Sequence, residues 1–127
     1  NWQDSHWNSI KSAYGSAPYF EFYAHIFQKF YEKRYEYLFD FNVELLNATL
    51  VILKTDKAFE YTTAYQMTSD EVIDLRSEKS TGTNDLRQLR YLQVFEERHG
   101  FLPNLSIIDL IFNLGPQATD YLNKSFT

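Results

Sequence analysis

Residues 93–122, QVFEERHGFLPNLSIIDLIFNLGPQATDYL, contain the strongest local signals in the chain. The apolar spacing ahead of them predicts a helix over residues 85–99. Gly100 follows at the position where a helix end favours a residue with positive φ. Pro103 then prevents helix from resuming at once. We therefore expect a tight corner after His99.

A second corner follows within the same stretch. Ser106 is suited to cap the next helix, and Asp109, three residues on, is suited to return the hydrogen bond of a capping box. Gly115 ends that helix. Pro116 fits the first turn of a last helix over residues 116–122, because a first-turn N–H has no intrahelical partner to lose.

Three longer helices are predicted upstream, over residues 4–14, 18–33 and 36–53. Large rings lie on more than one stripe of the second, so we expect it to be buried on two sides or to lie in an interface. The third is expected to be the backbone of the core. Its predicted inner side carries Leu38, Phe41, Leu45 and Ile52, with Leu46, Leu50 and Leu53 beside them.

The pattern changes after the third helix. Residues 59–63 alternate large or β-branched with polar side chains, which is typical of one strand or of an extended connector. Thr68 and Glu71 form a second capping-box pattern ahead of a short helix over residues 69–76. Residues 77–84 are polar and contain a glycine, so we expect a mobile loop.

The expected fold is mainly α: a compact bundle of about five to six helices with at most one short extended strand segment. We expect residues 1–127 to form a single helical domain. The chain begins Asn-Trp-Gln without Met, and a lone strand cannot satisfy its own backbone groups. Both features favour a longer native protein that has a further N-terminal segment.

Composition narrows the function classes. The 127 residues carry a net charge of −5, and the basic residues are scattered apart from Lys29, Lys33 and Arg34, which disfavours a nucleic-acid partner. Cysteine is absent, which excludes disulfides, thiolate metal sites and cysteine nucleophiles. No apolar run approaches the ~20 residues of a transmembrane helix. We therefore expect a cytoplasmic protein without a membrane span, and we predict no metal site and name no cofactor.

Histidines are the first candidates for chemistry, because the sequence contains no Gly-rich phosphate loop or nucleophile elbow. His99 ends a predicted helix, where Glu96, Arg98 and Asn104 fall close enough to orient it and to bind a polar ligand. Its alternative role is to cap the helix dipole. His6 stands beside Trp7, and the pair is a second candidate for a base with a stacking ring.

The remaining polar candidates have structural alternatives. Arg76, after Asp74, is a weak candidate for anion binding. Asp109 is better explained as a helix cap than as a general base, and Trp7 is explained by packing as well as by stacking on a sugar ring. His25, flanked by Ala24 and Ile26, is interpreted as structural.

Three blocks together resemble the bacterial WbqC-like protein family: HWNSIKSAYGSAPYFEFY at residues 6–23, YEYLFDFNVELL at residues 35–46, and the stretch at residues 93–122. The last block is the most specific, so the resemblance is assigned to the C-terminal helical portion. The resemblance implies a longer protein, and a role in surface-polysaccharide (O-antigen) biosynthesis with modification of amino sugars. No catalytic residue is transferred from the family by position.

Two functions remain as hypotheses. In the first, the protein transfers an acyl or aminoacyl group to an amino sugar on a sugar nucleotide or a lipid-linked sugar. A polar concavity would then collect His6 or His99 with a carboxylate and an arginine. In the second, it is a non-catalytic interaction or dimerisation module, forming a homodimer through the aromatic helix at residues 18–33. The candidate site residues are His99, His6 and Glu96 for catalysis, and Arg98, Asn104, Trp7 and Arg76 for substrate binding.

Overall fold

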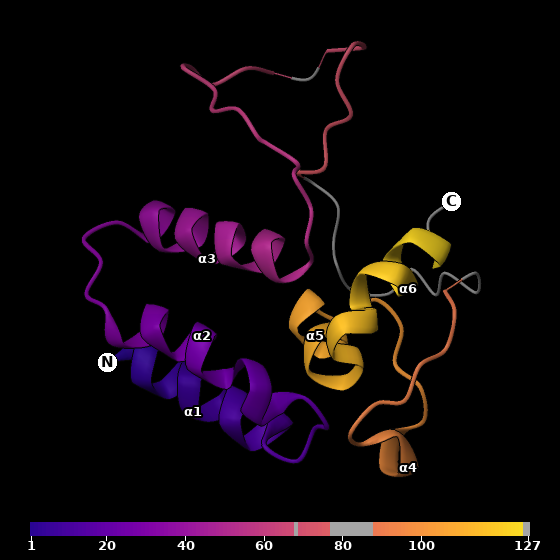
Figure 1. The fold of residues 1–127 in the computed structure, drawn as a ribbon. Coiled ribbons are helices and arrows are strands. Elements are labelled where there is room, and N and C mark those ends of the chain that lie inside the picture. The colour runs from indigo at the N-terminus through magenta and orange to yellow at the C-terminus, as the bar shows by residue number, and fades with distance from the viewer. Residues whose placement is uncertain (68, 77–87, 126–127) are drawn as a thin grey trace.

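Helices make up all the regular structure in the described part of the chain. The structure is a computed structural model that describes residues 1–67, 69–76 and 88–125. Within those ranges there is no strand, so the expected mainly helical fold is confirmed (Figure 1). The elements are α1 (Trp2–Tyr14), α2 (Phe20–Glu32), α3 (Leu38–Ile52), α4 (Glu96–His99), α5 (Ile107–Leu114), the 3-10 turn η1 (Gly115–Gln117) and α6 (Ala118–Ser125).

The central element is α2, which packs against α1, α3 and α5. Its inward face carries Tyr23, Phe27 and Tyr31, all buried. The expectation that this aromatic helix is buried on more than one side is therefore confirmed. Three neighbouring helices cover most of its rings, although Phe22 remains 65% exposed. A single amphipathic contact would cover only one stripe of the helix.

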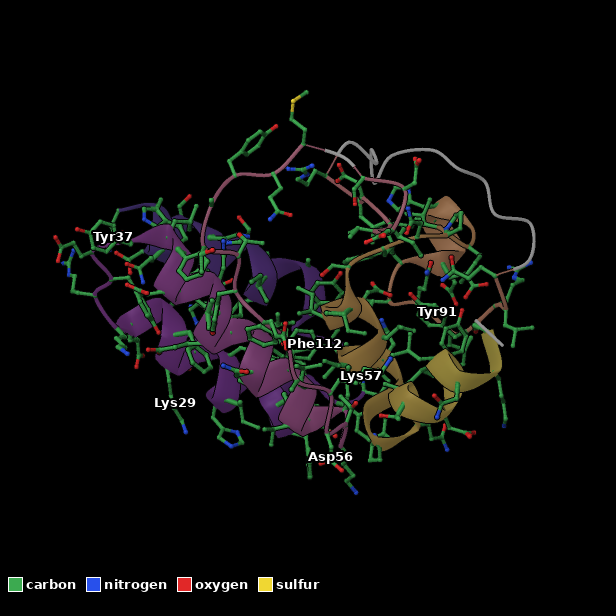
Figure 2. All side chains as sticks on the ribbon, turned by 90° about the horizontal axis from the view of Figure 1, so that it is seen from above. Lys29, Tyr37, Asp56, Lys57, Tyr91 and Phe112 are labelled. Carbon is green, nitrogen blue, oxygen red and sulfur yellow. The ribbon has the colours of Figure 1, made fainter. Side chains whose placement is uncertain are left out.

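The most buried side chains belong to α5. Ile111 and Phe112 are completely buried, and the Phe112 ring meets Phe27 edge-on with ring centroids 5.5 Å apart. The Tyr19 amide also donates to the Phe112 carbonyl at 2.9 Å, which ties the start of α2 to α5. Phe112 accordingly lies where α5 meets the layer formed by α1, α2 and α3 (Figure 2).

The third helix lies at the edge of this core rather than at its centre. Phe41 and Thr49 are its buried residues, while Leu38 and Leu46 are exposed. The predicted role of α3 as the backbone of the core is therefore wrong. Its hydrophobic residues are spread around the helix. Phe41 lies on the side that faces α2, where its ring packs edge-on against Tyr31.

The segment after α3 extends away from the helices (Figure 1). Residues 59–63 form no strand and residues 69–76 form no helix, so these two predictions are wrong and the connector alternative holds. Among the described residues neither segment pairs with a strand, and the first contacts α3 through the rings of Tyr61 and Phe39. The predicted loop at residues 77–84, Thr68 and residues 85–87 lie outside the described residues.

The helix predicted over residues 85–99 is also wrong over its described part, residues 88–95, because only the turn Glu96–His99 is helical. Tyr91 is buried, whereas its neighbour Leu92 is 81% exposed. The Tyr91 ring packs edge-on against Phe101 and Tyr121. These contacts with distant residues outweigh the local helical pattern.

Candidate functional site

The candidate site is built around Asp109 in the first turn of α5. Ser106 caps this helix as expected, with its hydroxyl accepting from the Ile108 amide at 3.5 Å. Asp109 does not return the hydrogen bond of a capping box. Its side chain turns into the protein and is only 4% exposed. The predicted capping role of Asp109 is therefore wrong, and the chain buries a carboxylate instead.

Neutral groups surround this carboxylate in the described part of the chain. The Tyr91 hydroxyl donates to Oδ1 at 2.6 Å. The Asn113 amide donates to the same oxygen at 3.3 Å and to the Asp109 carbonyl at 2.9 Å. The phenol of Tyr14, at the end of α1, lies near enough to this carboxylate for the two groups to interact electrostatically. The carboxylate is thus hydrogen-bonded, as a buried polar group must be, and the partners found for it in residues 1–67, 69–76 and 88–125 are neutral.

The two phenols are held in their protonated form. Burial raises the pKa of Tyr91, and its hydrogen bond to Asp109 raises it further. Burial raises the pKa of Tyr14 too, followed by the Asp109 charge and the hydrogen bond to it. Both groups therefore remain hydrogen-bond donors throughout the neutral pH range.

Tyr14 and Asp109 line a small cavity of about 170 Å³, with His99 also in its wall. We call it the Asp109 pocket. Most of its remaining wall is apolar, and the lining is completed by Ala13, Gln93, Val94, Phe95, Gly100, Leu102 and Leu105. A cavity of similar size in an apolar core holds benzene. The pocket therefore fits one small functional group or the edge of a ring.

A side-chain clamp fixes the wall that carries His99. The Gln93 amide donates to the Leu102 carbonyl at 2.8 Å and accepts from the Leu102 amide at 2.9 Å. Between them lies Gly100, with φ of 67° and ψ of −176°. That conformation is accessible almost only to glycine. The expected corner after His99 is confirmed, and it is what places the imidazole at the pocket.

The other predicted residues of this region lie outside the lining. Glu96 accepts from Arg90 at 2.7 Å, and this bond, with one from the Gln93 amide, lowers the pKa of the Glu96 carboxyl. Arg98 is exposed on α4. The Asn104 amide donates to the Gln88 side chain at 2.6 Å. Of the four residues grouped around the corner after His99, His99 alone is among the described residues that line the pocket.

The remaining candidates lie elsewhere. His6 is exposed on α1 and its ring meets Tyr31 edge-on at 5.3 Å. Trp7 is buried and stacks with Tyr31 at 5.5 Å, which places it in the core. Arg76 donates from Nη2 to Asp74 at 2.6 Å and lines a separate cavity, whose described lining comes from residues 62–67 and 69–76. The structure does not bring these three residues together with His99.

Sequence reasoning missed Tyr14, Tyr91 and Asn113 and assigned Asp109 another role. Tyr91 and Asp109 are 18 positions apart and face each other only after the chain has folded back. One local signal was available: Asn113 lies four residues after Asp109 in the same helix, a spacing that brings two side chains together.

Two general features of the described residues bear on function. No group of three or more His, Cys, Asp or Glu side chains within residues 1–67, 69–76 and 88–125 is arranged to hold a metal ion. Over the same ranges, every helix is too short or too polar to cross a membrane.

Comparison with known families identifies the chain. A model described as the WbqC-like protein family matches residues 1–84, which is more than half of the 127 residues. The chain belongs to the WbqC-like protein family. The match contains α1, α2 and α3 of this WbqC-like protein and stops before α4. No curated protein and no solved structure gives a significant match.

The position of the match corrects one expectation. The resemblance was assigned to the C-terminal helical portion, but the family model matches the N-terminal part of the chain. The match contains two of the three blocks that carried the resemblance, residues 6–23 and 35–46, and does not reach the third, residues 93–122. In the Asp109 pocket, Ala13 and Tyr14 belong to the matched residues, whereas His99 and Asp109 lie beyond them.

Proposed function

We propose that this WbqC-like protein binds the amino group of an amino sugar in the Asp109 pocket and takes part in acyl or aminoacyl transfer to that group. The resemblance to a family associated with surface polysaccharides supplies the substrate class, and the sugar would be carried by a nucleotide or a lipid. We place the reaction in the cytoplasm. The observation that carries the proposal is a buried carboxylate with neutral partners, at a cavity that His99 also lines.

An amine suits the Asp109 pocket for electrostatic reasons. A carboxylate has about four lone-pair sites, and in the described part of the chain the Asp109 carboxylate accepts hydrogen bonds from Tyr91 and Asn113, both at Oδ1. One further donor can therefore bind. A buried charge gains most from an opposite charge, because water no longer screens the pair. An ammonium group is the small donor that brings this charge.

The size of the pocket decides how much of the substrate enters it. Sites for complete small ligands occupy ≈ 300–1,000 Å³, whereas the Asp109 pocket has about 170 Å³. The amino-bearing edge of a sugar ring fits this volume. A nucleotide or lipid carrier would remain outside, beyond the wall that contains His99.

His99 is then positioned to serve as the base. The bound ammonium first gives one proton to the imidazole, because only the neutral amine has a lone pair with which to attack the acyl carbonyl carbon. The new C–N bond then forms, and the bond from the carbonyl carbon to the leaving oxygen or sulfur breaks with its electron pair. The imidazolium protonates that leaving atom, and the second nitrogen proton leaves to solvent through the freed imidazole. Histidine suits this role because its charge changes near neutral pH.

A site-resolved titration tests the binding step. Backbone amide NMR signals of residues 93–105 are followed while glucosamine is added, and then glucose, which has a hydroxyl in place of the amine. We expect glucosamine to shift these signals and glucose to leave them unchanged. Asp109→Asn keeps the size of the side chain and removes its charge, so the glucosamine response should disappear. Asp120→Asn is the control, since Asp120 forms an exposed pair with Lys124 on α6.

Two outcomes would contradict the binding proposal: equal responses to glucosamine and glucose, or an unchanged response in Asp109→Asn. The transfer step is tested separately with glucosamine and an acyl thioester or an aminoacyl donor. His99→Gln should still bind glucosamine but should lose transfer. Binding without transfer in the unmodified protein would leave a sugar-binding role and exclude the transferase.

The alternative of an interaction module is favoured by one surface. Exposed apolar side chains on α3 include Leu38, Phe39, Leu46 and Val51. The rings of α2 are a weaker basis for a dimer, because Phe27 and its inward neighbours belong to the core. Sedimentation would decide: a dimer that Leu46→Glu dissociates, together with no response to glucosamine, would favour the module over the transferase.

A further inference from the structure

A second cavity lies at the corner where α2 ends and α3 begins. It has a volume of about 400 Å³, within the range of sites that hold complete small ligands. We call it the α2–α3 pocket. Its described lining comes from the α2–α3 corner, from α3 and from Tyr61 in the segment after α3.

A polar network that is partly exposed to solvent lines the α2–α3 pocket. The Lys33 ammonium donates to both carboxylate oxygens of Glu44, at 2.7 and 2.8 Å. The Tyr35 hydroxyl donates to Glu44 at 2.7 Å, and the Lys33 nitrogen lies 4.8 Å from the centre of the Tyr35 ring. Three side chains from two sides of one corner therefore hold each other in place. Such preorganised groups lower the cost of binding a ligand.

The rim of the pocket is aromatic and open to solvent. Phe39 is 61% exposed and Tyr61 is 58% exposed. Their ring centroids are 5.8 Å apart with planes inclined at 58°, and Phe59 supports Tyr61 edge-on at 5.5 Å. Exposed rings that line a concave site are a common mark of ligand binding, because a ligand that covers them removes apolar surface from water.

The charges select the kind of ligand. The lining holds two cations, Lys33 and Arg34, and three carboxylates, of which Asp40 and Glu44 are two and Glu36 is the third. A phosphate would meet more negative than positive charge, and a wholly apolar ligand would leave these groups without partners. A neutral ring with many hydroxyls can donate to the carboxylates, accept from the cations, and lay its C–H face on an aromatic ring.

We propose that the α2–α3 pocket binds a neutral polyhydroxylated ring, such as a pyranose. This site is separate from the Asp109 pocket, since the two share no lining residue. Tyr37, at the α2–α3 corner, and Tyr91, which contacts Asp109, lie toward opposite ends of the molecule (Figure 2). The proposal therefore stands whether or not Asp109 binds an amine.

The test is a titration of the full chain with methyl α-glucopyranoside, followed by NMR at the amides of residues 33–44 and 59–61. Matched probes are cyclohexanol, which keeps the ring without the hydroxyl array, inorganic phosphate and choline. We expect the glycoside alone to shift these signals. Tyr61→Ala should weaken its affinity about tenfold, the equivalent of one good aromatic contact, while Tyr61→Phe should retain it. Phe22→Ala, which removes an exposed ring outside the pocket, should leave the affinity unchanged.

Several results would overturn the proposal. Equal responses to cyclohexanol and the glycoside would mean that the rim binds any apolar ring. A response to phosphate or choline in place of the glycoside would assign the site to a charged ligand. If Tyr61→Ala misfolds, Asp40→Asn replaces it, and an unchanged glycoside affinity in that variant would count against the site. Asp109→Asn should keep the glycoside response here, so the two proposals can fail independently.

Discussion

At the scale of single residues, the buried amide of Gln3 holds the end of α2. Its Nε2 donates to the carbonyls of Phe30, Tyr31 and Lys33, at 3.2, 3.2 and 2.7 Å. The last carbonyls of a helix have no partner within that helix. The Gln3 side chain, from α1, therefore acts as a C-terminal cap for α2. Nothing in the local sequence indicates this role, because the partners lie 27 to 30 positions away.

We predict that Gln3→Leu destabilises the protein by about 1–3 kcal/mol, because it leaves buried carbonyls without a donor. Urea unfolding followed by circular dichroism measures the free energy of unfolding. Gln28→Leu is the matched control. Gln28 lies exposed on α2, and its side chain donates to the exposed side chain of Glu32 rather than to a buried carbonyl. Equal losses in the two variants would contradict the capping role.

Gly115 carries a second residue-level prediction. Its φ is 55°, and a Cβ there would lie 2.5 Å from the Tyr19 ring. Gly100 also has positive φ, but a Cβ there would meet nothing within 4 Å. We therefore expect Gly115→Ala to lower the melting temperature more than Gly100→Ala, because the first adds a clash to the backbone strain that both share. A Gly115→Ala and Tyr19→Leu double variant should recover part of the difference; no recovery would place the cost in the backbone alone.

The candidate site was predictable only in part at this scale. His99 was found because Gly100 marks a helix end, a signal carried by neighbouring residues. Asp109 was misassigned, since an acidic residue three positions after Ser106 satisfies the capping-box pattern equally well. Asp109 can be buried because Tyr91 supplies a donor from another part of the chain and Tyr14 packs its phenol near the carboxylate. A one-dimensional pattern carries no information on those groups.

At the scale of elements, predictions succeeded where local signals act alone. The bounds of α1, α2 and α3 agree with the predicted bounds to within two residues. In these helices the spacing of apolar residues, the polar residues of the solvent-facing side and the breakers Gly15 and Pro18 all predict the same boundaries. Gly115 ends α5 as expected. The predictions for residues 59–63, 69–76 and 88–95 failed, since those segments are short and tertiary contacts decide their conformation.

One hydrogen bond joins two elements that are far apart in the chain. The Thr119 hydroxyl, on α6, donates to the Leu53 carbonyl at the end of α3 at 2.6 Å. We predict that Thr119→Val, which keeps the shape and removes the donor, costs about 1 kcal/mol. Amide hydrogen exchange should accelerate in α6 and in the last turn of α3, where the freed carbonyl lies.

Thr62→Val is the control for this variant, because Thr62 is exposed on the segment after α3. It should leave exchange in α6 unchanged. If Thr119→Val accelerates exchange evenly across all helices, the bond stabilises the whole fold rather than the junction of α3 and α6.

At the scale of the whole molecule, the two pockets are products of chain topology. The α2–α3 pocket is formed mostly by neighbouring residues around one corner, with Tyr61 added from the segment after α3. The Asp109 pocket combines the end of α1 with residues 93–109. Basic residues Lys33 and Arg34 were noted in the sequence as a small group, but their balance with three carboxylates becomes visible only when the corner closes.

Buried tyrosines give the whole molecule a common response to alkaline pH. Five phenols have a raised pKa, and burial is the largest cause for each: Tyr14, Tyr23, Tyr31, Tyr35 and Tyr91. In the unfolded chain a tyrosine loses its proton near pH ≈ 10. The folded protein keeps these protons to higher pH. The stability from this source is therefore complete below about pH 10 and falls as the pH rises further, because the unfolded state then binds fewer protons.

We predict that the free energy of unfolding, measured in urea at several pH values between about 9 and 11, declines above pH ≈ 10. Tyr91→Phe removes one of the five groups, so its decline should be shallower, although the variant is less stable at neutral pH for want of the bond to Asp109. Tyr65→Phe removes an exposed phenol and should follow the unmodified protein. Parallel curves for Tyr91→Phe and the unmodified protein would mean that Tyr91 loses its proton at the same pH in the folded and unfolded states. In that case, burial and the hydrogen bond to Asp109 would not raise the pKa of Tyr91.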